Sequence, residues 1–111
     1  MNSRIDLHLH STASDGRLSP TDVVKLAASR GLRLIALTDH DTTNGCDEAQ
    51  AQGARENLRV IAGVELNTDS DLGEVHILGY LKDIHQPKLQ NALDGLRIKR
   101  EERARQIVEK L

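Results

Sequence analysis

Four short apolar segments, separated by stretches with helical character, constrain the fold of this chain most strongly. We expect β-strands at four places: 4–9 (RIDLHL), 32–41 (LRLIALTDHD), 59–66 (RVIAGVEL) and 74–81 (EVHILGYL). We expect helices at 19–31, 44–57 and 87–111. The order βαβαββα is typical of an α/β fold with a mostly parallel sheet, either open and doubly wound or part of a barrel.

Local signals predict where the first two helices begin and end. Ser19 is a favourable N-cap, and Pro20 suits the first helical position. Gly31 is expected to end this helix at the position that favours a positive φ. Asn44 is expected to cap the second helix in the same way as Ser19 caps the first.

Composition excludes several classes of protein. Tyr80 is the only aromatic residue in 111, so the core must be aliphatic, and a base-stacking platform for single-stranded nucleic acid has no rings to work with. The net charge of −2 gives no basic excess for binding a phosphate backbone. A phosphorylated ligand would need positive charge from another source, such as bound metal ions.

The sequence carries no signal for a membrane partner. No apolar stretch approaches the ~18–20 residues that a membrane span needs, and the first ten residues lack the apolar region of a signal peptide. Cys46 is the single cysteine, so no internal disulfide can form. These features predict a cytoplasmic protein.

Unusual polar residues stand at the same end of three predicted strands. His8 and His10 close the first strand, Asp39 and His40 the second, and Glu65 the third. Sites in parallel α/β folds form at the carboxyl ends of strands, so we expect these side chains to meet. Two histidines on one strand face repel when charged, whereas imidazole is a common metal ligand, which predicts that His8 and His10 bind a metal.

His76 lies early in its strand and needs a hairpin to reach this end. A turn centred near Asp71 would place His76 opposite Leu66 and about level with Glu65. Asp15 lies within the sequence SDG. It is either a functional residue of the site or a residue that shapes the turn, because aspartate commonly shapes turns of this kind.

Four motifs in order, DLHLHSTASDG, ALTDHDT, AGVELN and EVHILGY, resemble the polymerase and histidinol phosphatase (PHP) superfamily, and the chain looks most similar to its small bacterial phosphoesterases. The resemblance implies a distorted (β/α)7 TIM-like barrel that binds up to three divalent ions, Mn, Fe or Zn. It implies that His8 and His10 bind the first ion, that Glu65 bridges the first and second, and that His76 binds the second. Asp15 and His40 then match ligands of the third.

The resemblance also implies roles outside the ligand set. Asp6 and Asp39 match groups that orient the imidazoles and assist catalysis. Arg100 and Arg103 fall where the family places arginines toward the substrate phosphate, although a solvated helix face accounts for them equally well.

Residues 1–111 match the amino-terminal part of a PHP domain, because the family's barrel is longer and its final ligands lie in the later portion. Four strands cannot close a barrel, so we expect an open sheet edge through which the chain self-associates, and little activity from these residues alone.

The expected reaction is hydrolysis of a phosphate ester in a phosphorylated small molecule, a nucleotide or a short oligonucleotide. Clustered divalent ions offset the phosphate charge and lower the pKa of a bound water to near ~7, giving a hydroxide nucleophile. Two alternatives remain at this point: a non-catalytic PHP module that serves a structural role, and a metal-dependent amidohydrolase, since such barrels also use H-x-H.

Overall fold

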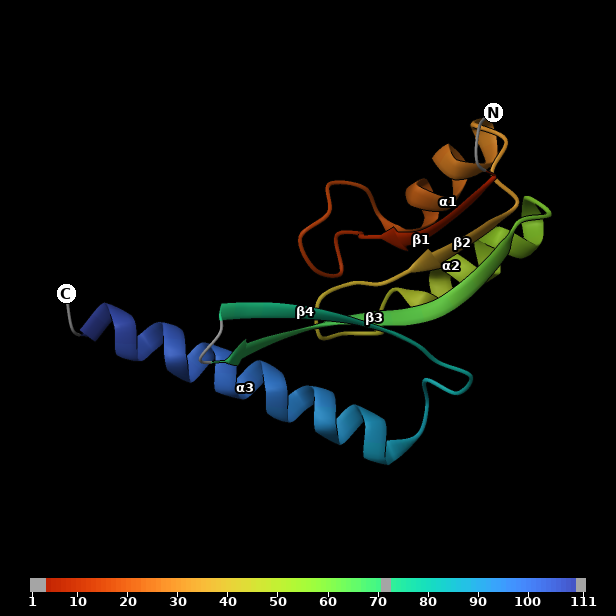
Figure 1. Cartoon of the computed structure of the whole chain (residues 1–111). Helices are drawn as coiled ribbons and strands as arrows, with labels where there is room; N and C mark the ends of the chain where they lie inside the picture. Colours follow the sequence, from red (N-terminus) through yellow and green to blue (C-terminus); the bar gives the residue numbers. More distant parts are fainter. Residues whose placement is uncertain (1–3, 71–72, 110–111) are drawn as a thin grey trace.

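The computed structural model describes residues 4–70 and 73–109 and gives the backbone alone for 67–70, 73–75, 100, 101 and 103–109. Its elements follow the predicted order: β1 (Ile5–Leu9), α1 (Pro20–Ser29), β2 (Leu34–Leu37), α2 (Cys46–Arg55), β3 (Arg59–Ser70), β4 (Gly73–Tyr80) and α3 (Pro87–Glu109) (Figure 1). The strands form one sheet in the order β1-β2-β3-β4. β1, β2 and β3 run parallel, and β4 runs antiparallel to β3.

The helix signals near α1 are confirmed, and the one near α2 is wrong. The Ser19 hydroxyl accepts a hydrogen bond from the backbone N–H of Asp22, and Gly31 has φ +80° just beyond the helix. Gly45, not Asn44, is the N-cap of α2, and it makes no side-chain capping bond. A Cβ at Gly45 would lie 2.8 Å from Pro20 Cγ, so this close approach to α1 requires glycine and moves the helix start past Asn44.

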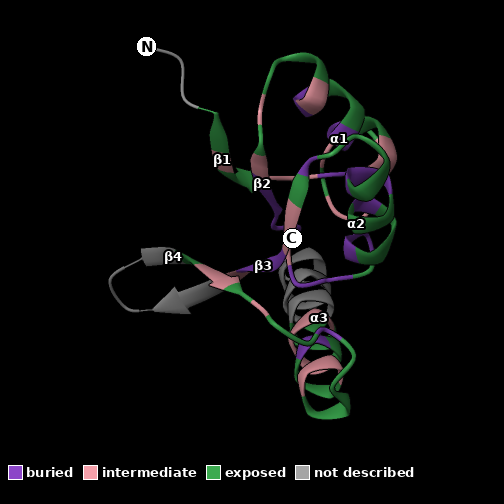
Figure 2. Cartoon of the chain, turned by 90° about the vertical axis from the view of Figure 1, so that its right-hand side faces the viewer, coloured by how far each residue is buried: buried purple, intermediate pink, exposed green. Residues whose placement is uncertain are grey.

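The core is aliphatic, as the composition predicts. α1 and α2 lie side by side and turn their buried residues toward the sheet (Figure 2). The largest cluster of buried residues is Val23, Val24, Ala27, Ile35, Leu37, Ala49 and Leu58. This packing holds the parallel strands in place, and their carboxyl ends are left to polar residues.

The second strand is shorter than expected because the chain leaves the ladder after Leu37. Beyond that point the Thr38 N–H donates to the carbonyl of Leu9. A single isolated bridge pairs His40 with Glu65, and Asp41 follows with φ +52°. The segment that carries His40 is therefore held by a few specific backbone bonds and not by a regular strand.

The hairpin of β3 and β4 exists, but its first arm, β3, is longer than predicted. β3 continues to Ser70, four residues beyond the predicted end of the strand at 66, and its last pair is Ser70 with Gly73. His76 pairs with Asn67 and not with Leu66, so the predicted register is wrong by one residue. The expected turn centre at Asp71 lies outside the described residues.

α3 is joined to the remainder of the chain through the loop that follows β2. The Gln90 amide donates to Thr43 Oγ1 at 2.9 Å, and the Arg97 guanidinium donates to the carbonyl of Asp41. Among the described helices, none combines the length and apolar character needed to cross a membrane.

Candidate metal centre

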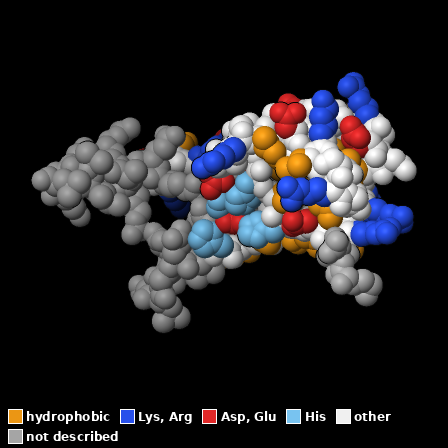
Figure 3. Space-filling model, turned by 90° about the horizontal axis from the view of Figure 1, so that it is seen from above, with side chains coloured by type: hydrophobic (Ala, Val, Ile, Leu, Met, Phe, Trp, Pro, Cys, Tyr) orange, Lys and Arg blue, Asp and Glu red, His pale blue; other side chains and the backbone are white. Residues whose placement is uncertain are grey.

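Six side chains that are far apart in the sequence meet on one face of the sheet, where histidines and acidic groups gather (Figure 3). His8 belongs to β1, Glu65 to β3 and His76 to β4. The other three come from the loops after β1 and β2; the full set is His8, His10, Asp15, His40, Glu65 and His76. The structure thus brings together every residue that the sequence proposed as a metal ligand.

Glu65 lies at the centre of the cluster and is 3% exposed. Its Oε1 contacts Nε2 of His8 and lies 3.2 Å from Nε2 of His10. Its Oε2 lies 2.7 Å from Nδ1 of His76 and 3.2 Å from Nδ1 of His40. One buried carboxylate therefore contacts four imidazoles, two through each of its oxygens.

Asp15 provides a second carboxylate on the outer side of the cluster. Its Oδ1 lies 3.0 Å from Nδ1 of His10, and its Oδ2 lies 3.1 Å from Nε2 of His40. Both imidazoles thus stand between Asp15 and Glu65, with their ring centroids 4.4 Å apart. The loop after β1 therefore places Asp15 at the cluster, beyond any role it has in shaping the SDG turn.

The imidazoles strongly favour the ionised form of both carboxylates. Burial by itself raises the pKa of Glu65, but hydrogen bonds from His76 and His8 and the charge of His40 outweigh it and lower the pKa to about 2. For Asp15, partial burial likewise opposes the shift, and the charges of His40 and His10 lower the pKa below its ordinary value. Two carboxylates thus stay negative within a group of imidazoles.

The donor atoms form three groups, each compact enough to surround one cation. The groups are His8 with His10 and Glu65, His10 with Asp15 and His40, and His40 with Glu65 and His76. Within each group the ligand atoms lie within 4.8 Å of one another. Imidazole and carboxylate donors without thiolate suit Zn, Mn or Fe, so the residues present fit divalent metal ions.

The hydrogen bonds described for Asp39 run to the loop after β1, and its role in orienting an imidazole stays a prediction. Its carboxylate is 1% exposed and accepts three hydrogen bonds: from the Ser11 N–H at 2.6 Å, from the Ser11 hydroxyl at 2.7 Å and from the Ser14 hydroxyl at 2.7 Å. Successive side chains of an extended segment point to opposite sides, so Asp39 points away from the cluster when His40 points into it. Asp39 shapes the loop that carries Asp15.

Asp6 acts on the backbone of His8, and its expected role in orienting an imidazole stays a prediction. Its Oδ1 accepts a hydrogen bond from the backbone N–H of His8 at 3.1 Å. Arg100 and Arg103 lie on α3, but their side chains are outside the described part of the chain. Their role in binding phosphate therefore stays a prediction.

Sequence reasoning missed several residues that support the cluster. Ser11 and Ser14 bind Asp39, Arg97 binds the carbonyl beside His40, and the Tyr80 hydroxyl binds the carbonyl of Leu7. Two features of the sequence could have pointed to residues in this group. Arg97 continues the three-residue spacing of Arg100 and Arg103, and Tyr80 is the single aromatic residue.

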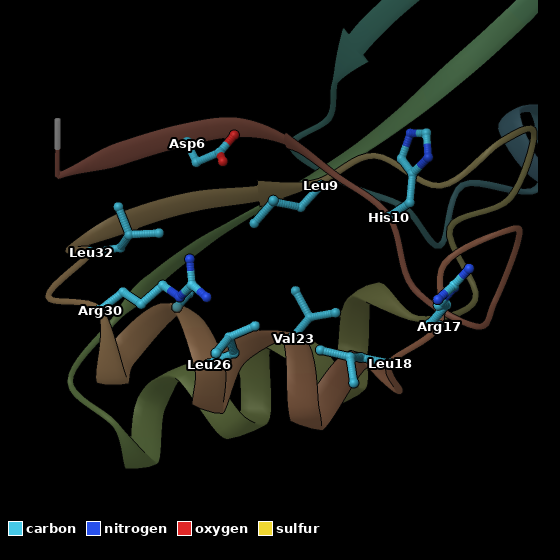
Figure 4. Close-up of a pocket in the computed structure, with 10 residues that line it drawn as sticks. Asp6, Leu9, His10, Arg17, Leu18, Val23, Leu26, Arg30 and Leu32 are labelled. Carbon is cyan, nitrogen blue, oxygen red and sulfur yellow. The ribbon is translucent and has the colours of Figure 1, made fainter. Parts of the chain in front are cut away.

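A separate cavity of about 330 Å³ lies between β1 and α1 (Figure 4). Leu9 and Val23 contribute to its apolar wall, and Arg17 and Arg30 lie toward its two ends. Of the six clustered side chains only His10 lines it. Because the other five clustered side chains do not line this cavity, we assign it no chemical role.

Comparison with known proteins identifies the family. The sequence model of the PHP domain matches residues 6–109. The chain belongs to the PHP domain family.

Among curated proteins, a 5′-3′ exoribonuclease from Haemophilus influenzae is 42% identical over 111 residues, which is all of this chain and 40% of that protein. A 3′,5′-nucleoside bisphosphate phosphatase from Chromobacterium violaceum is 46% identical over 105 residues, covering 95% of this chain and 37% of that protein.

A solved structure confirms the fold class. An amidohydrolase from Chromobacterium violaceum, determined with bound sulfate and no metal, matches 94% of this chain and 37% of its own, with a TM-score of 0.86 and 46% identity. The PHP-type fold, in the form of part of a TIM-like barrel, is therefore confirmed. The chain spans about two fifths of the length of these relatives.

Proposed function

We propose that this PHP chain forms part of a metal-dependent phosphoesterase that hydrolyses a phosphate ester in a nucleotide or a short oligonucleotide. The observation that carries the proposal is the buried Glu65 carboxylate in contact with four imidazoles. The relatives named as an exoribonuclease and as a nucleoside bisphosphate phosphatase support this substrate class. Glu65 and Asp15 place two carboxylates among imidazole nitrogens, which is a donor set that favours a divalent cation at this position.

The six clustered residues divide among up to three divalent ions of Mn, Fe or Zn. His8, His10 and Glu65 would hold the first, Glu65 and His76 the second, and Asp15 and His40 the third. When bound, such ions activate a water molecule for attack and offset the negative charge of the phosphate. The pKa of about 2 keeps Glu65 in the ionised form that a metal ligand requires.

The residues of the chain itself would position these groups and the substrate. Asp39 fixes the loop from Ser11 to Ser14 and thereby the place of Asp15. Arg100 and Arg103, one helical step apart on α3, are proposed to bind the substrate phosphate. The buried free thiol of Cys46 supports a reducing, cytoplasmic location. Ile5 and Ile77 lie on the two edge strands of the sheet, and their exposed apolar side chains support self-association.

The test is metal content together with phosphate release, measured on the native protein that carries this chain. His8→Ala combined with His10→Ala should lose bound metal by elemental analysis, and phosphate release from a nucleoside 3′,5′-bisphosphate and from a short oligoribonucleotide should fall with it. His85→Ala is the matched control, because His85 is exposed and pairs with Asp47 away from the cluster.

Each outcome of this test separates the alternatives. Unchanged metal stoichiometry in the double variant would contradict the ligand assignment. Bound metal with amide hydrolysis and no phosphate release would favour an amidohydrolase, the activity in the name of one solved relative. Bound metal with neither activity would favour a non-catalytic module.

Arg100→Ala is expected to raise KM for a phosphorylated substrate by about ten- to a hundredfold, since one charge-assisted hydrogen bond is worth about 1.5–3 kcal/mol. Metal content should stay unchanged, because α3 carries none of the six clustered residues. Steady-state kinetics and elemental analysis on the same preparation provide the two readings. An unchanged KM would leave Arg100 on a solvated helix face.

A further inference from the structure

The peptide unit between Leu7 and His8 lies outside the regular ladder of the sheet. Asp6 pairs with Ile35 and Leu9 pairs with Leu37, so β1 advances by three residues where β2 advances by two. The register assigns no β2 partner to Leu7 or His8. Such a bulge rotates the side chains of its strand, and here it precedes the two histidines of the cluster.

Both polar groups of this peptide unit are held by side chains. The His8 N–H donates to Asp6 Oδ1 at 3.1 Å. The Leu7 carbonyl accepts a hydrogen bond from the Tyr80 hydroxyl at 3.0 Å. Because a peptide unit is planar and rigid, fixing its oxygen and its N–H fixes its plane, and with it the direction in which the side chain of His8 leaves the backbone.

The contact of Tyr80 joins strands from opposite edges of the sheet. β1 and β4 are the two outer strands, and they face each other because the sheet curls (Figure 2). Tyr80 pairs directly with Gly63 on β3, where no side chain stands beside the phenol. The single aromatic side chain of the protein can therefore cross from β4 and reach the backbone of β1.

His8 depends on this backbone support more than His10 and His40 do. Its side chain is 54% exposed, whereas those of His10 and His40 are 21% and 14% exposed. Packing restrains a half-exposed imidazole weakly. Its direction toward Glu65 Oε1 is set by that contact, by the edge-to-face approach of its ring to His10 and by the plane of the preceding peptide unit.

We propose that Tyr80 is a positioning residue that orients His8 for metal binding by fixing the Leu7–His8 peptide unit, together with Asp6. The proposal rests on the proposed metal-binding function, because an oriented His8 matters only if His8 is a ligand. Tyr80 contacts neither of the two clustered carboxylates through any described bond, so its effect passes through the backbone.

The test is a double-mutant cycle in the 111-residue chain, with Zn²⁺ and Mn²⁺ affinities measured by calorimetry. Tyr80→Phe removes only the hydroxyl and should weaken metal binding by about two- to tenfold, the range of one net hydrogen bond. In the His8→Ala background the same change should have no further effect. Ser29→Ala is the matched control, because its hydroxyl also donates to a backbone carbonyl, that of Leu26, but on α1 away from the cluster.

An equal loss of affinity in both backgrounds would overturn the proposal, since Tyr80 would then act without His8. So would an affinity in Tyr80→Phe equal to that of the parent chain. If Tyr80→Phe fails to fold, Asp6→Ala releases the other end of the same peptide unit and should give the same pattern against His8→Ala.

A second reading separates this proposal from the proposed function. In the metal-free chain, Tyr80→Phe should shift the imidazole ¹H–¹⁵N resonances of His8 more than those of His40. If the parent chain binds no metal, the proposed function fails, yet the shift of His8 still decides whether Tyr80 positions it. Unmoved His8 resonances would overturn the positioning role even if metal binds.

Discussion

Replacing Glu65 by glutamine is expected to lower the free energy of unfolding of the metal-free chain by about 3 kcal/mol at pH 5, and by little at pH 2. The reason is the difference in the pKa of Glu65 between the two states. Hydrogen bonds and charges of the imidazoles lower it to about 2 in the folded chain, against an ordinary value of 4.5. Urea denaturation at several pH values between 2 and 6 measures the difference.

The sign follows from proton binding. Between about pH 4.5 and pH 2 the unfolded chain binds the proton and the folded chain does not, so stability rises with pH through this window. The contribution of Glu65 is complete above the unfolded value and is lost as the pH falls through about 2. Glutamine carries no proton equilibrium, so the gap between the two proteins should close on acidification.

Glu102→Gln is the matched control for this prediction. Glu102 is an exposed glutamate on α3, and replacing it removes one negative charge without touching the cluster. Its substitution should change stability by a few tenths of a kcal/mol. A gap between the parent chain and Glu65→Gln that stays constant from pH 6 to pH 2 would show that the imidazoles do not hold the folded carboxylate in its ionised form.

Local signals predicted the parts of this fold that depend on neighbouring residues. The N-cap of α1 depends only on the Ser19 side chain and the backbone N–H of Asp22, three residues later. The sequence alone is therefore sufficient to locate it. The order of strands and helices follows from hydrophobic periodicity, which is also local. The start of α2 was predicted one residue early, because the close approach of Gly45 to Pro20 is a tertiary contact that no local pattern reveals.

The membership of the cluster was predictable for a different reason. Parallel strands bring their carboxyl ends together, so His10 and His40 meet beside Glu65, which follows the last residue of β3 that pairs with β2. His76 joins them because residues two apart on a strand share a face: Glu65 lies on the same side as Asn67, the partner of His76. The predicted pairing with Leu66 would have turned His76 to the opposite face from Glu65, so membership of the cluster depends on the observed register.

The supporting contacts were not predictable, because each depends on how a loop or an irregular strand folds back. Asp39 stands next to His40 in the sequence but points to the opposite side and binds Ser11. The bulge in β1 leaves Ile5 and Leu7 exposed although Leu9 packs against the core, so strict alternation failed within one strand. These irregular places are where the candidate centre is built, as is common for functional sites.

The loop after β1 is expected to lose its structure when Asp39 is replaced by alanine. Three donors from Ser11 and Ser14 would lose a buried charged acceptor, and the free energy of unfolding should fall by about 3 kcal/mol or more. Asp39→Asn keeps one carbonyl oxygen for two of these donors and should cost less. Chemical denaturation of the metal-free chain measures both losses.

The same substitution should also weaken the metal centre, because the loop carries Asp15. Gly16 packs so tightly in this loop that a Cβ there would lie 2.6 Å from the His10 carbonyl, so the loop has little freedom to compensate. Asp22→Ala, which removes an exposed aspartate from the first turn of α1, is the control. An Asp39→Ala protein that keeps both the stability and the metal content of the parent chain would mean that the three hydrogen bonds do not hold Asp15 in place. A protein that loses stability but keeps all of its metal would show that Asp15 is dispensable as a ligand, and that the other five clustered residues suffice.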